Sequence, residues 1–563
     1  MKKKGLLITV MVVLLLILGI VFIFGMIYMS LTAEPYVPDQ AYLKINLAGP
    51  IYESPAKSFP SLASSGLSIR DLWFHLQRAK IDRRIRGIVI KILPLECGLA
   101  KIEEIGGLLR DFKRSGKPVV ALVEEGGLRE YYLGSFADKV YGFRGGSLYL
   151  HGFAAEATFI KNTFSKLGIK AEFYHTGDYK TASNMFTEDR LTPAHRESLE
   201  KLLTDFTASV NAGIAANRHV APEVVHRLLE DSPLPNEDYL KAKLLDGVAY
   251  EDEIVDNLKP HCPLVAFSTY RKTSSPAPFR GSQQIAVVFA SGEIYSGEGG
   301  GKSLLGDEVL GADTVAEFLR SARKNFSVKA VVLRIDSPGG SPSASDVILR
   351  EAELLAQKKP LVVSMSDLAG SGGYWIALGG REIYAQPSTL TGSIGVLGGK
   401  FVLRDFYTKI GVSKEIVETT PCSAMFSDYR EFSPAEREKV LAEMRQIYQG
   451  FLRRVSQSRK LSLAGVERLA QGRVWSGRSA VDVRLIDHLG GLNEAVAAAK
   501  RLARIREGEP VGMKIYPREK TLLDVVLQLF ESRSENPLDI QARLKMYEHF
   551  YPALELPFTV KIR

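Results

Sequence analysis

The pattern of apolar and polar positions begins with one long apolar run. Residues 5–31 contain no charged side chain and follow three consecutive lysines. At 1.5 Å per residue this run exceeds the ~30 Å hydrocarbon core of a bilayer. It is longer than the apolar region of a cleavable signal peptide, so we predict an uncleaved membrane-spanning helix, with cleavage near residues 31–33 as the alternative. The three lysines favour an N-terminus on the cytoplasmic side, which places the rest of the chain on the extracytoplasmic side of the membrane.

The rest of the chain alternates short β-branched runs with helical patterns. In the second half, strands are predicted at residues 285–288, 330–335 and 361–364, and helices at residues 312–324 and 344–357. This alternation is typical of βαβ units with right-handed crossovers and a mostly parallel sheet. The pattern therefore predicts an α/β fold.

The sequence also repeats itself at an offset of 243 positions. Gly49 aligns with Gly292, and residues 88–90 (Ile-Val-Ile) align with residues 331–333 (Val-Val-Leu). An internal repeat of this length indicates two related domains in one chain.

We predict the domain boundaries from this repeat and from composition. Thr192 and Ser433 each precede a proline at the start of a long helical pattern, which is a typical helix start. Residues 269–282 have the composition of a linker, and the segment after about Arg504 has no counterpart in the first half. The predicted segments are the anchor with a short linker (1–36), the N-terminal repeat (37–268), a linker (269–282), the C-terminal repeat (283–504) and a tail (505–563).

Composition narrows the functional classes. A chain of 563 residues exceeds one ordinary core. The net charge of +9 includes no basic block beyond residues 2–4, which argues against a nucleic-acid groove and fits a protein near anionic lipid. The three cysteines form no C-x-x-C pair, so we predict neither a disulfide framework nor a zinc site.

A glycine-rich turn carries a candidate nucleophile. Residues 370–375 read Gly-Ser-Gly-Gly-Tyr-Trp and follow the strand predicted at 361–364 and a loop predicted at 365–369. A serine between small residues at the entry to a helix exposes its hydroxyl, and the N–H of Gly372 would face a developing oxyanion. The alternative is a turn selected only for tight packing. The offset places Leu128 where the first copy would need the serine.

A second glycine pair follows another strand. Residues 336–340 read Asp-Ser-Pro-Gly-Gly, and glycines behind a proline let backbone amides turn toward a substrate. We assign Gly339 as a second oxyanion donor, with an ordinary strand–helix turn as the alternative. The first copy has Leu-Pro-Leu-Glu-Cys-Gly at residues 93–98, so it lacks this loop as well.

The histidines offer a weak case for a general base. After the linker, His488 lies in a turn at the end of the repeat and His549 lies in the tail, and neither position is typical of a catalytic residue. His151 and His175 in the first half are more plausible candidates for a Ser-His-Asp arrangement.

A lysine is the other candidate base. Lys180 lies among small residues in the segment 177–182 (Gly-Asp-Tyr-Lys-Thr-Ala), and the aligned segment 418–423 has no lysine. A lysine acts as a base only when it is neutral, and burial against the other half would favour that form. Ser393, in the segment 391–395 (Thr-Gly-Ser-Ile-Gly), could orient the amine. The alternatives are a solvated surface lysine and a plain turn.

These four motifs, in their order along the chain, resemble the signal peptide peptidase A family in its long, duplicated, membrane-anchored form of the bacterial protease IV type. The chain is more distantly similar to the Clp protease and crotonase fold. The resemblance extends from the anchor to about Arg504. It implies two tandem crotonase/Clp-protease-like domains after an N-terminal transmembrane helix.

The resemblance also implies roles for individual residues. It implies a serine endopeptidase with a Ser/Lys dyad, in which Ser371 is the nucleophile and Lys180 is the general base. It further implies that Ser393 orients the lysine and that Gly339 and Gly372 form the oxyanion hole.

The family's biology supplies the remaining expectations. The resemblance implies degradation of remnant signal peptides left in the membrane, a homotetramer shaped as a membrane-facing bowl, and a single-pass protein of the inner membrane with a periplasmic catalytic domain. No metal or nucleotide cofactor and no nucleic-acid partner are expected. Asp178 stands where the family often has a basic residue, and because a carboxylate could raise the pKa of Lys180 we expect Asp178 to point outward. The alternatives are a catalytically inactive membrane scaffold on the same fold and a crotonase-type acyl-thioester enzyme.

Overall fold

A computed structural model describes residues 34–55, 66–258, 262–299, 309–506 and 508–518, together with isolated residues between 11 and 26. Most of the apolar run at residues 5–31 and the tail after residue 518 lie outside the described residues, so the predicted membrane-spanning helix falls largely outside them too. Among the residues that are described, no helix is long and apolar enough to cross a bilayer.

The described part of the first half forms a six-stranded parallel sheet, as the βαβ pattern predicts. Most strands are buried β-branched runs, typical of a parallel sheet covered on both faces. In sheet order the strands are β8 (Gly247–Ala249), β5 (Lys139–Phe143), β3 (Val119–Val123), β2 (Ile85–Glu96), β1 (Ala41–Pro50) and β9 (Leu264–Ala266).

The described part of the second half forms a larger sheet with the same plan. Its parallel strands, in sheet order, are β19 (His488–Leu489), β15 (Glu382–Ala385), β14 (Leu361–Gly370), β13 (Val328–Ser337), β10 (Gln284–Ser291) and β20 (Gly512–Tyr516). Two further strands extend it: β16 (Leu390–Gly392) pairs with the end of β14, and β18 (Val474–Ser476) runs antiparallel to β16.

The second sheet differs from the sequence prediction at two strands. β14 continues to Gly370, through the residues predicted as a loop, because it exchanges one neighbour for another: residues 362–364 pair with β15 and residues 368–370 pair with β16. β20 lies within the predicted tail, yet it flanks β10 as β9 flanks β1. The sequence repeat did not reveal the correspondence between β9 and β20, because β9 is short and the two strands have little sequence in common.

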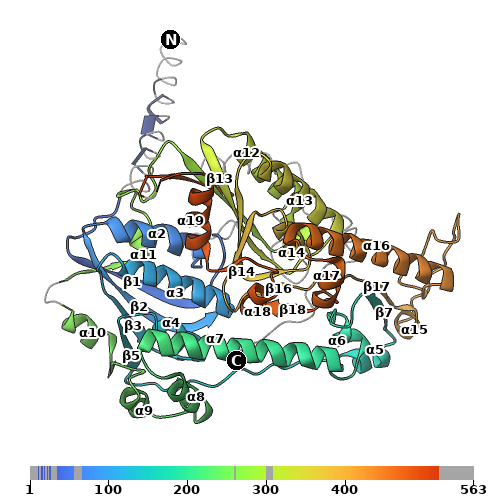
Figure 1. Cartoon of the computed structure of the whole chain (residues 1–563), viewed down its shortest axis with the longest axis horizontal. Coiled ribbons are helices and arrows are strands. Elements are labelled where there is room, and N and C mark those ends of the chain that lie inside the picture. Colours follow the sequence, from blue (N-terminus) through green and yellow to red (C-terminus); the bar gives the residue numbers. More distant parts are fainter. Residues whose placement is uncertain are drawn as a thin grey trace, which may run out of the picture.

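The helices cover both sheets and join the two halves (Figure 1). Thr192 and Ser433 cap two long helices of matching position, and each side chain accepts a hydrogen bond from the first turn, as their sequences predict. In Figure 1, α7 runs horizontally below elements of both halves, with α8 and α9 beneath it. The helices of the first half are α2 (Ile69–Ile81), α3 (Leu99–Lys113), α4 (Leu128–Gly134), α5 (Lys161–Leu167), α6 (Asn184–Thr187), α7 (Pro193–Arg218), α8 (Pro222–Glu230), α9 (Asn236–Lys241), α10 (Glu251–Asn257) and α11 (Phe267–Tyr270). Those of the second half are α12 (Ala312–Lys324), α13 (Pro342–Ala356), α14 (Gly372–Ala377), α15 (Arg404–Lys409), α16 (Pro434–Arg459), α17 (Leu463–Leu469), α18 (Gly477–Asp482) and α19 (Leu492–Leu502).

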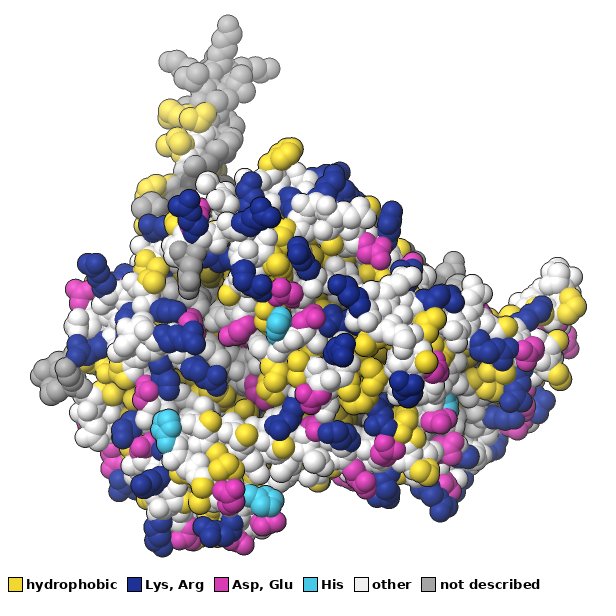
Figure 2. Space-filling view, in the orientation of Figure 1, with side chains coloured by type: hydrophobic (Ala, Val, Ile, Leu, Met, Phe, Trp, Pro, Cys, Tyr) yellow, Lys and Arg dark blue, Asp and Glu magenta, His cyan; other side chains and the backbone are white. Residues whose placement is uncertain are grey.

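The two halves share a continuous apolar core. Ile285 and Val287 from β10 and Leu492 from α19 pack in one cluster with the buried residues of the first half. Trp73 adds a polar link, because its indole N–H donates to Asn493 Oδ1 at 2.8 Å. On the face shown in Figure 2, basic and acidic side chains are interspersed rather than gathered by sign.

The described residues also form three two-stranded sheets. β4 (Gly126–Gly127) pairs with β6 (Leu148–Tyr149), and β11 (Glu293–Tyr295) pairs with β12 (Val309–Gly311). The third joins the two halves directly, because β7 (Lys170–His175) pairs antiparallel with β17 (Leu397–Val402).

Candidate active site

Ser371 occupies a sharp turn between β14 and α14. Its φ of 54° and ψ of −111° lie outside the regions that non-glycine residues favour. The backbone is held there from both sides: Ser371 N donates to Gly392 O at 2.8 Å, and Trp375 N donates to Ser371 O at 2.8 Å. Residues kept in such conformations cluster at functional sites, where the surrounding structure holds the strain.

Lys180 reaches the second half because β7 enters it as a strand. Immediately after β7, Thr176 N donates to Val396 O at 2.9 Å, and then Tyr179 N donates to Gln471 O at 2.9 Å. Each bond fixes the chain of the first half on a different segment of the second half. The lysine that follows is fully buried.

The side chains of Lys180, Ser371 and Ser393 meet in one buried cluster. Lys180 Nζ lies 2.9 Å from Ser371 Oγ and 3.0 Å from Ser393 Oγ, and it also lies 3.3 Å from the Ser393 carbonyl oxygen. All three residues are fully buried. Ser393, like Ser371, has a positive φ, of 51°. An amine at this distance from a serine hydroxyl has the geometry needed to take up its proton.

A segment that the sequence analysis did not single out supports the lysine from behind. A Cβ added to Gly472 would lie 2.4 Å from Lys180 Cβ, and the φ of Gly472 is 77°. Only a glycine leaves room for the lysine backbone at this point. The pair Gln471 and Gly472, both with positive φ, forms a tight turn, and the Gln-Gly dipeptide after a helical pattern was the available sequence signal.

Tyr179, Glu197 and Arg473 form a polar cluster that holds the loop carrying Lys180 beside this turn. Tyr179 Oη donates to Glu197 Oε2 at 2.8 Å, and Arg473 also pairs with Glu197. The guanidinium carbon of Arg473 lies 3.9 Å from the Tyr179 ring centroid, within cation–π range. The hydrogen bonds from Tyr179 and Arg473 lower the pKa of Glu197, so the carboxylate stays ionised.

The two glycines expected to stabilise an oxyanion lie next to each other. A Cβ on Gly372 would be 3.1 Å from Gly339 Cα, and the φ of Gly339 is 111°. Gly372 is the first residue of α14, as its sequence predicts. The N–H of Gly339 donates to Ser337 Oγ at 3.2 Å, which is long for such a bond. A substrate oxygen would compete with this hydroxyl for the same N–H.

Three of the four histidines considered from the sequence lie in the part of the chain that the structure describes, and none of these three hydrogen-bonds to Ser371. His151 and His175 are exposed, and His175 Nδ1 lies 2.9 Å from Gly177 O. His488 is exposed beside Glu382, and His549 lies outside the described residues. Among the residues that the structure describes, no histidine hydrogen-bonds to Ser371.

The first half carries no equivalent serine or oxyanion loop. Leu128, at the position matching Ser371, is the first residue of α4 and is buried in the core. Asp178, the neighbour of Lys180 at the start of its loop, is exposed, as expected.

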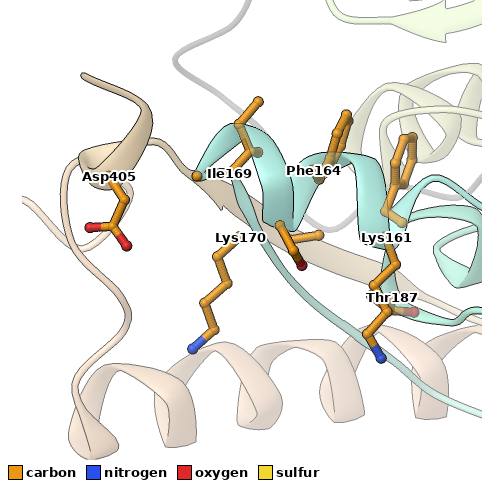
Figure 3. A pocket seen from close by; sticks show the side chains of 10 residues that line it. Lys161, Phe164, Ile169, Lys170, Thr187 and Asp405 are labelled. Atoms are coloured by element: carbon orange, nitrogen blue, oxygen red, sulfur yellow. The ribbon is translucent and has the colours of Figure 1, made fainter. Parts of the chain in front are cut away.

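A pocket of 510 Å³ lies at the junction of the two halves, away from the residues just described (Figure 3). It is lined by α5, β7, α6 and one acidic side chain of α15, Asp405. The side chains of Lys161 and Lys170 extend to the same side of it in Figure 3. None of the predicted site residues lines this pocket.

A protein-family model described as peptidase family S49 matches the chain twice, at residues 111–264 and 353–506. This chain belongs to peptidase family S49. The first match contains Lys180, and the second contains Ser371 and Ser393. Gly339 precedes the second match.

Curated proteins agree with this S49 assignment. The chain is 33% identical over 518 residues to "Serine protease SPPA, chloroplastic" from Arabidopsis thaliana, covering 90% of this chain and 76% of that protein. It is 34% identical over 497 residues to "Protease 4" from Salmonella typhi, covering 85% and 78%. It is also 28% identical over 197 residues to "Putative signal peptide peptidase SppA" from Enterococcus faecium, covering 35% and 57%. The protein is therefore a hydrolase, a serine protease with two tandem S49 domains.

Proposed function

We propose that this S49 serine protease uses a dyad of Ser371 and Lys180, contributed by different halves of the chain. The observation that carries the proposal is the 2.9 Å distance between Lys180 Nζ and Ser371 Oγ in a fully buried cluster. The strained strand-to-helix turn at Ser371 is typical of a serine nucleophile and supports the same role, although the hydroxyl is buried here and not exposed as its sequence predicts.

The proposed reaction proceeds by acyl transfer. The neutral amine of Lys180 accepts the proton of Ser371 as the hydroxyl oxygen attacks the scissile carbonyl carbon. The N–H groups of Gly339 and Gly372 bind the resulting oxyanion, for which the N–H of Gly339 leaves Ser337. The lysine ammonium then protonates the departing amine, and Lys180 next deprotonates the water that hydrolyses the acyl-enzyme. Ser393 holds the amine in line throughout, from 3.0 Å away.

The proposed substrates are remnant signal peptides left in the membrane after preprotein processing. Three observations support this choice: the uncharged run at residues 5–31, the duplicated S49 architecture, and a relative that carries the name of a putative signal peptide peptidase. The anchor would hold the catalytic domain at the extracytoplasmic face of the inner membrane, within reach of such peptides. We further propose that the chain works as a homotetramer.

The test uses the full chain in lipid vesicles that also hold a synthetic peptide with a signal-peptide apolar region. Mass spectrometry follows the fragments, and a fluorophosphonate probe reports which serine is reactive. Wild type should cleave the peptide and carry the probe on Ser371. Ser371→Ala and Lys180→Met should lose both cleavage and labelling, whereas Lys161→Met, an exposed lysine on α5, should keep both.

The outcomes separate the parts of the proposal. Cleavage that survives Lys180→Met would reject the lysine as base and leave the nucleophile intact. Labelling without cleavage of membrane peptides would reject the substrate class. A chain lacking residues 1–31 that still fractionates with vesicles would reject the anchor, and sedimentation showing a monomer would reject the tetramer.

A further inference from the structure

Two carboxylates lie where the pairing of β13 with β14 is interrupted. Ile335 pairs with Met365, but the next pair joins Ser337 to Ala369. One residue of β13, Asp336, therefore stands opposite residues 366–368 of β14. Such bulges are common next to active sites, where they redirect a strand.

Both carboxylates stand just ahead of residues with proposed catalytic roles. Asp336 leads into the loop that carries Gly339, and Asp367 leads into the turn that carries Ser371. The strand ends that position the nucleophile and the oxyanion donor thus share one irregular point of contact.

A cation from the first half bridges the two carboxylates. Lys101, on the first turn of α3, places Nζ 2.7 Å from Asp336 Oδ2 and 3.4 Å from Asp367 Oδ2. Its side chain is 9% exposed. Burial raises the pKa of Asp336 to about 6 while Lys101 opposes that shift, so the carboxylate is ionised at neutral pH. Although burial disfavours the charged lysine, Asp336 and Asp367 raise the pKa of Lys101.

The backbone at the start of α3 adds to this contact. Gly98 N donates to Asp367 Oδ2 at 2.8 Å, and Lys101 N donates to Asp367 Oδ1 at 2.9 Å. A Cβ on Gly98 would lie 2.4 Å from Asp367 Cγ, so the approach requires glycine. At the repeat offset, Gly98 matches Ser341, which caps the helix after the oxyanion loop of the second half. The first half has thus kept this helix start and uses it to hold a carboxylate of the other half.

We infer that Lys101 is a positioning residue that holds the strand ends carrying Gly339 and Ser371 in their working geometry across the interface between the halves. The inference rests on the proposed roles of those two residues. Without the lysine, Asp336 would be left buried and unpaired, and a group in that state moves or takes up a proton. Because Asp336 is part of the same loop as Gly339, its displacement would reach the oxyanion donor directly.

The test compares Lys101→Met with Lys80→Met in the full chain. Lys80 makes an ion pair of the same length, 2.7 Å to Asp111, but within the first half. Lys101→Met should lower kcat by about 100-fold and leave KM within about twofold, as expected for a misplaced catalytic group. Lys80→Met should leave both constants near those of wild type, and Lys101→Arg should recover part of kcat.

Hydrogen exchange and a double variant test the same role of Lys101 independently of the single variant's kinetics. Amide hydrogen exchange at residues 336–341 should quicken in Lys101→Met and not in Lys80→Met. The double variant Lys101→Met/Asp336→Asn removes one charge of each sign and leaves no unpaired carboxylate at position 336. It replaces the single variant in the assay if the single variant does not fold. Its kcat should lie about 10-fold below that of wild type, between the single variant and wild type.

Several results would overturn the inference. They are a wild-type kcat in Lys101→Met or in the double variant, an equal loss in Lys80→Met, and unchanged exchange at residues 336–341. Ser371→Ala, assayed in parallel, tests the proposed function separately. If Ser371→Ala stayed active, the dyad would be rejected, and the exchange data would still decide whether Lys101 holds the loop.

Discussion

Lys180 Nζ lies 2.9 Å from Ser371 Oγ, although 191 residues separate the two in the chain. The contact forms because β7 of the first half pairs with β17 of the second half and the loop that follows β7 hydrogen-bonds to Val396 and Gln471. Neither half alone contains both groups, so the proposed dyad forms only when the halves have docked. Loss of docking and loss of activity should therefore coincide.

Lys180→Arg separates proton transfer from charge. Arginine places a permanent cation near Ser371, because its guanidinium cannot lose its proton in a protein. We expect kcat to fall by about 1,000-fold, within the range for loss of a general base. Rates of peptide hydrolysis and of fluorophosphonate labelling measure this. A variant with more than a tenth of wild-type kcat would show that charge suffices.

Gly472→Ala should displace the lysine without altering it. The new Cβ would lie 2.4 Å from Lys180 Cβ, so we expect a fall in kcat of about 100-fold. Gly411→Ala is the matched control, because Gly411 has the same φ of 77° and no atom within 4 Å of an added Cβ. Steady-state kinetics on both variants test this, and equal losses would assign the effect to backbone strain alone.

Arg334→Met should destabilise the joined halves. Arg334 is fully buried and pairs with Glu53 at 2.9 Å and with Glu104 at 3.0 Å, two carboxylates of the first half. Removing the guanidinium leaves both carboxylates buried without the cation that pairs with them, which costs about 3–5 kcal/mol. Urea denaturation measures the loss. Arg404→Met, which removes an exposed pair with Asp405, should cost less than about 1 kcal/mol; similar values for the two variants would contradict the prediction.

Glu103→Gln should change how stability depends on pH. Burial raises the pKa of Glu103 from 4.5 to about 8, while hydrogen bonds from Ser388 oppose the shift. A carboxyl with a raised pKa favours the folded state below pH 4.5, and that contribution is lost as the pH rises through about 8. Relative to the glutamine variant, wild type should lose about 1.4 kcal/mol per pH unit across this window. Urea denaturation of both proteins at several pH values measures this, and parallel stability curves would refute it.

Local pattern predicted the elements well where each has its own periodicity. The helix predicted at residues 312–324 is α12 with the same bounds, because an amphipathic pattern identifies a helix without help from the rest of the chain. β14 extends beyond the predicted strand because its residues 368–370 pair with β16, which comes about twenty residues later in the sequence. Strand length in a sheet depends on neighbours, which a local pattern does not contain.

The candidate site was predicted as a set of residues, and the structure adds how they meet. The motifs around Lys180 and Ser371 are recognisable because each combines glycines with a chemical group. The supporting residues Gly472 and Lys101 carry no such combination. They matter through single contacts with distant segments, and only the folded chain brings those segments together.

Leu128 shows why the first half would not easily regain a serine at the position that matches Ser371. Its side chain is in the apolar core of the first half, so a serine there would weaken that core. It would gain no amine in return, because residues 418–423 of the other repeat contain no lysine. Restoring a second reaction centre would thus require several simultaneous changes, each harmful or useless alone. In the proposed dyad the two repeats therefore complement each other, because one supplies the lysine and the other the serine.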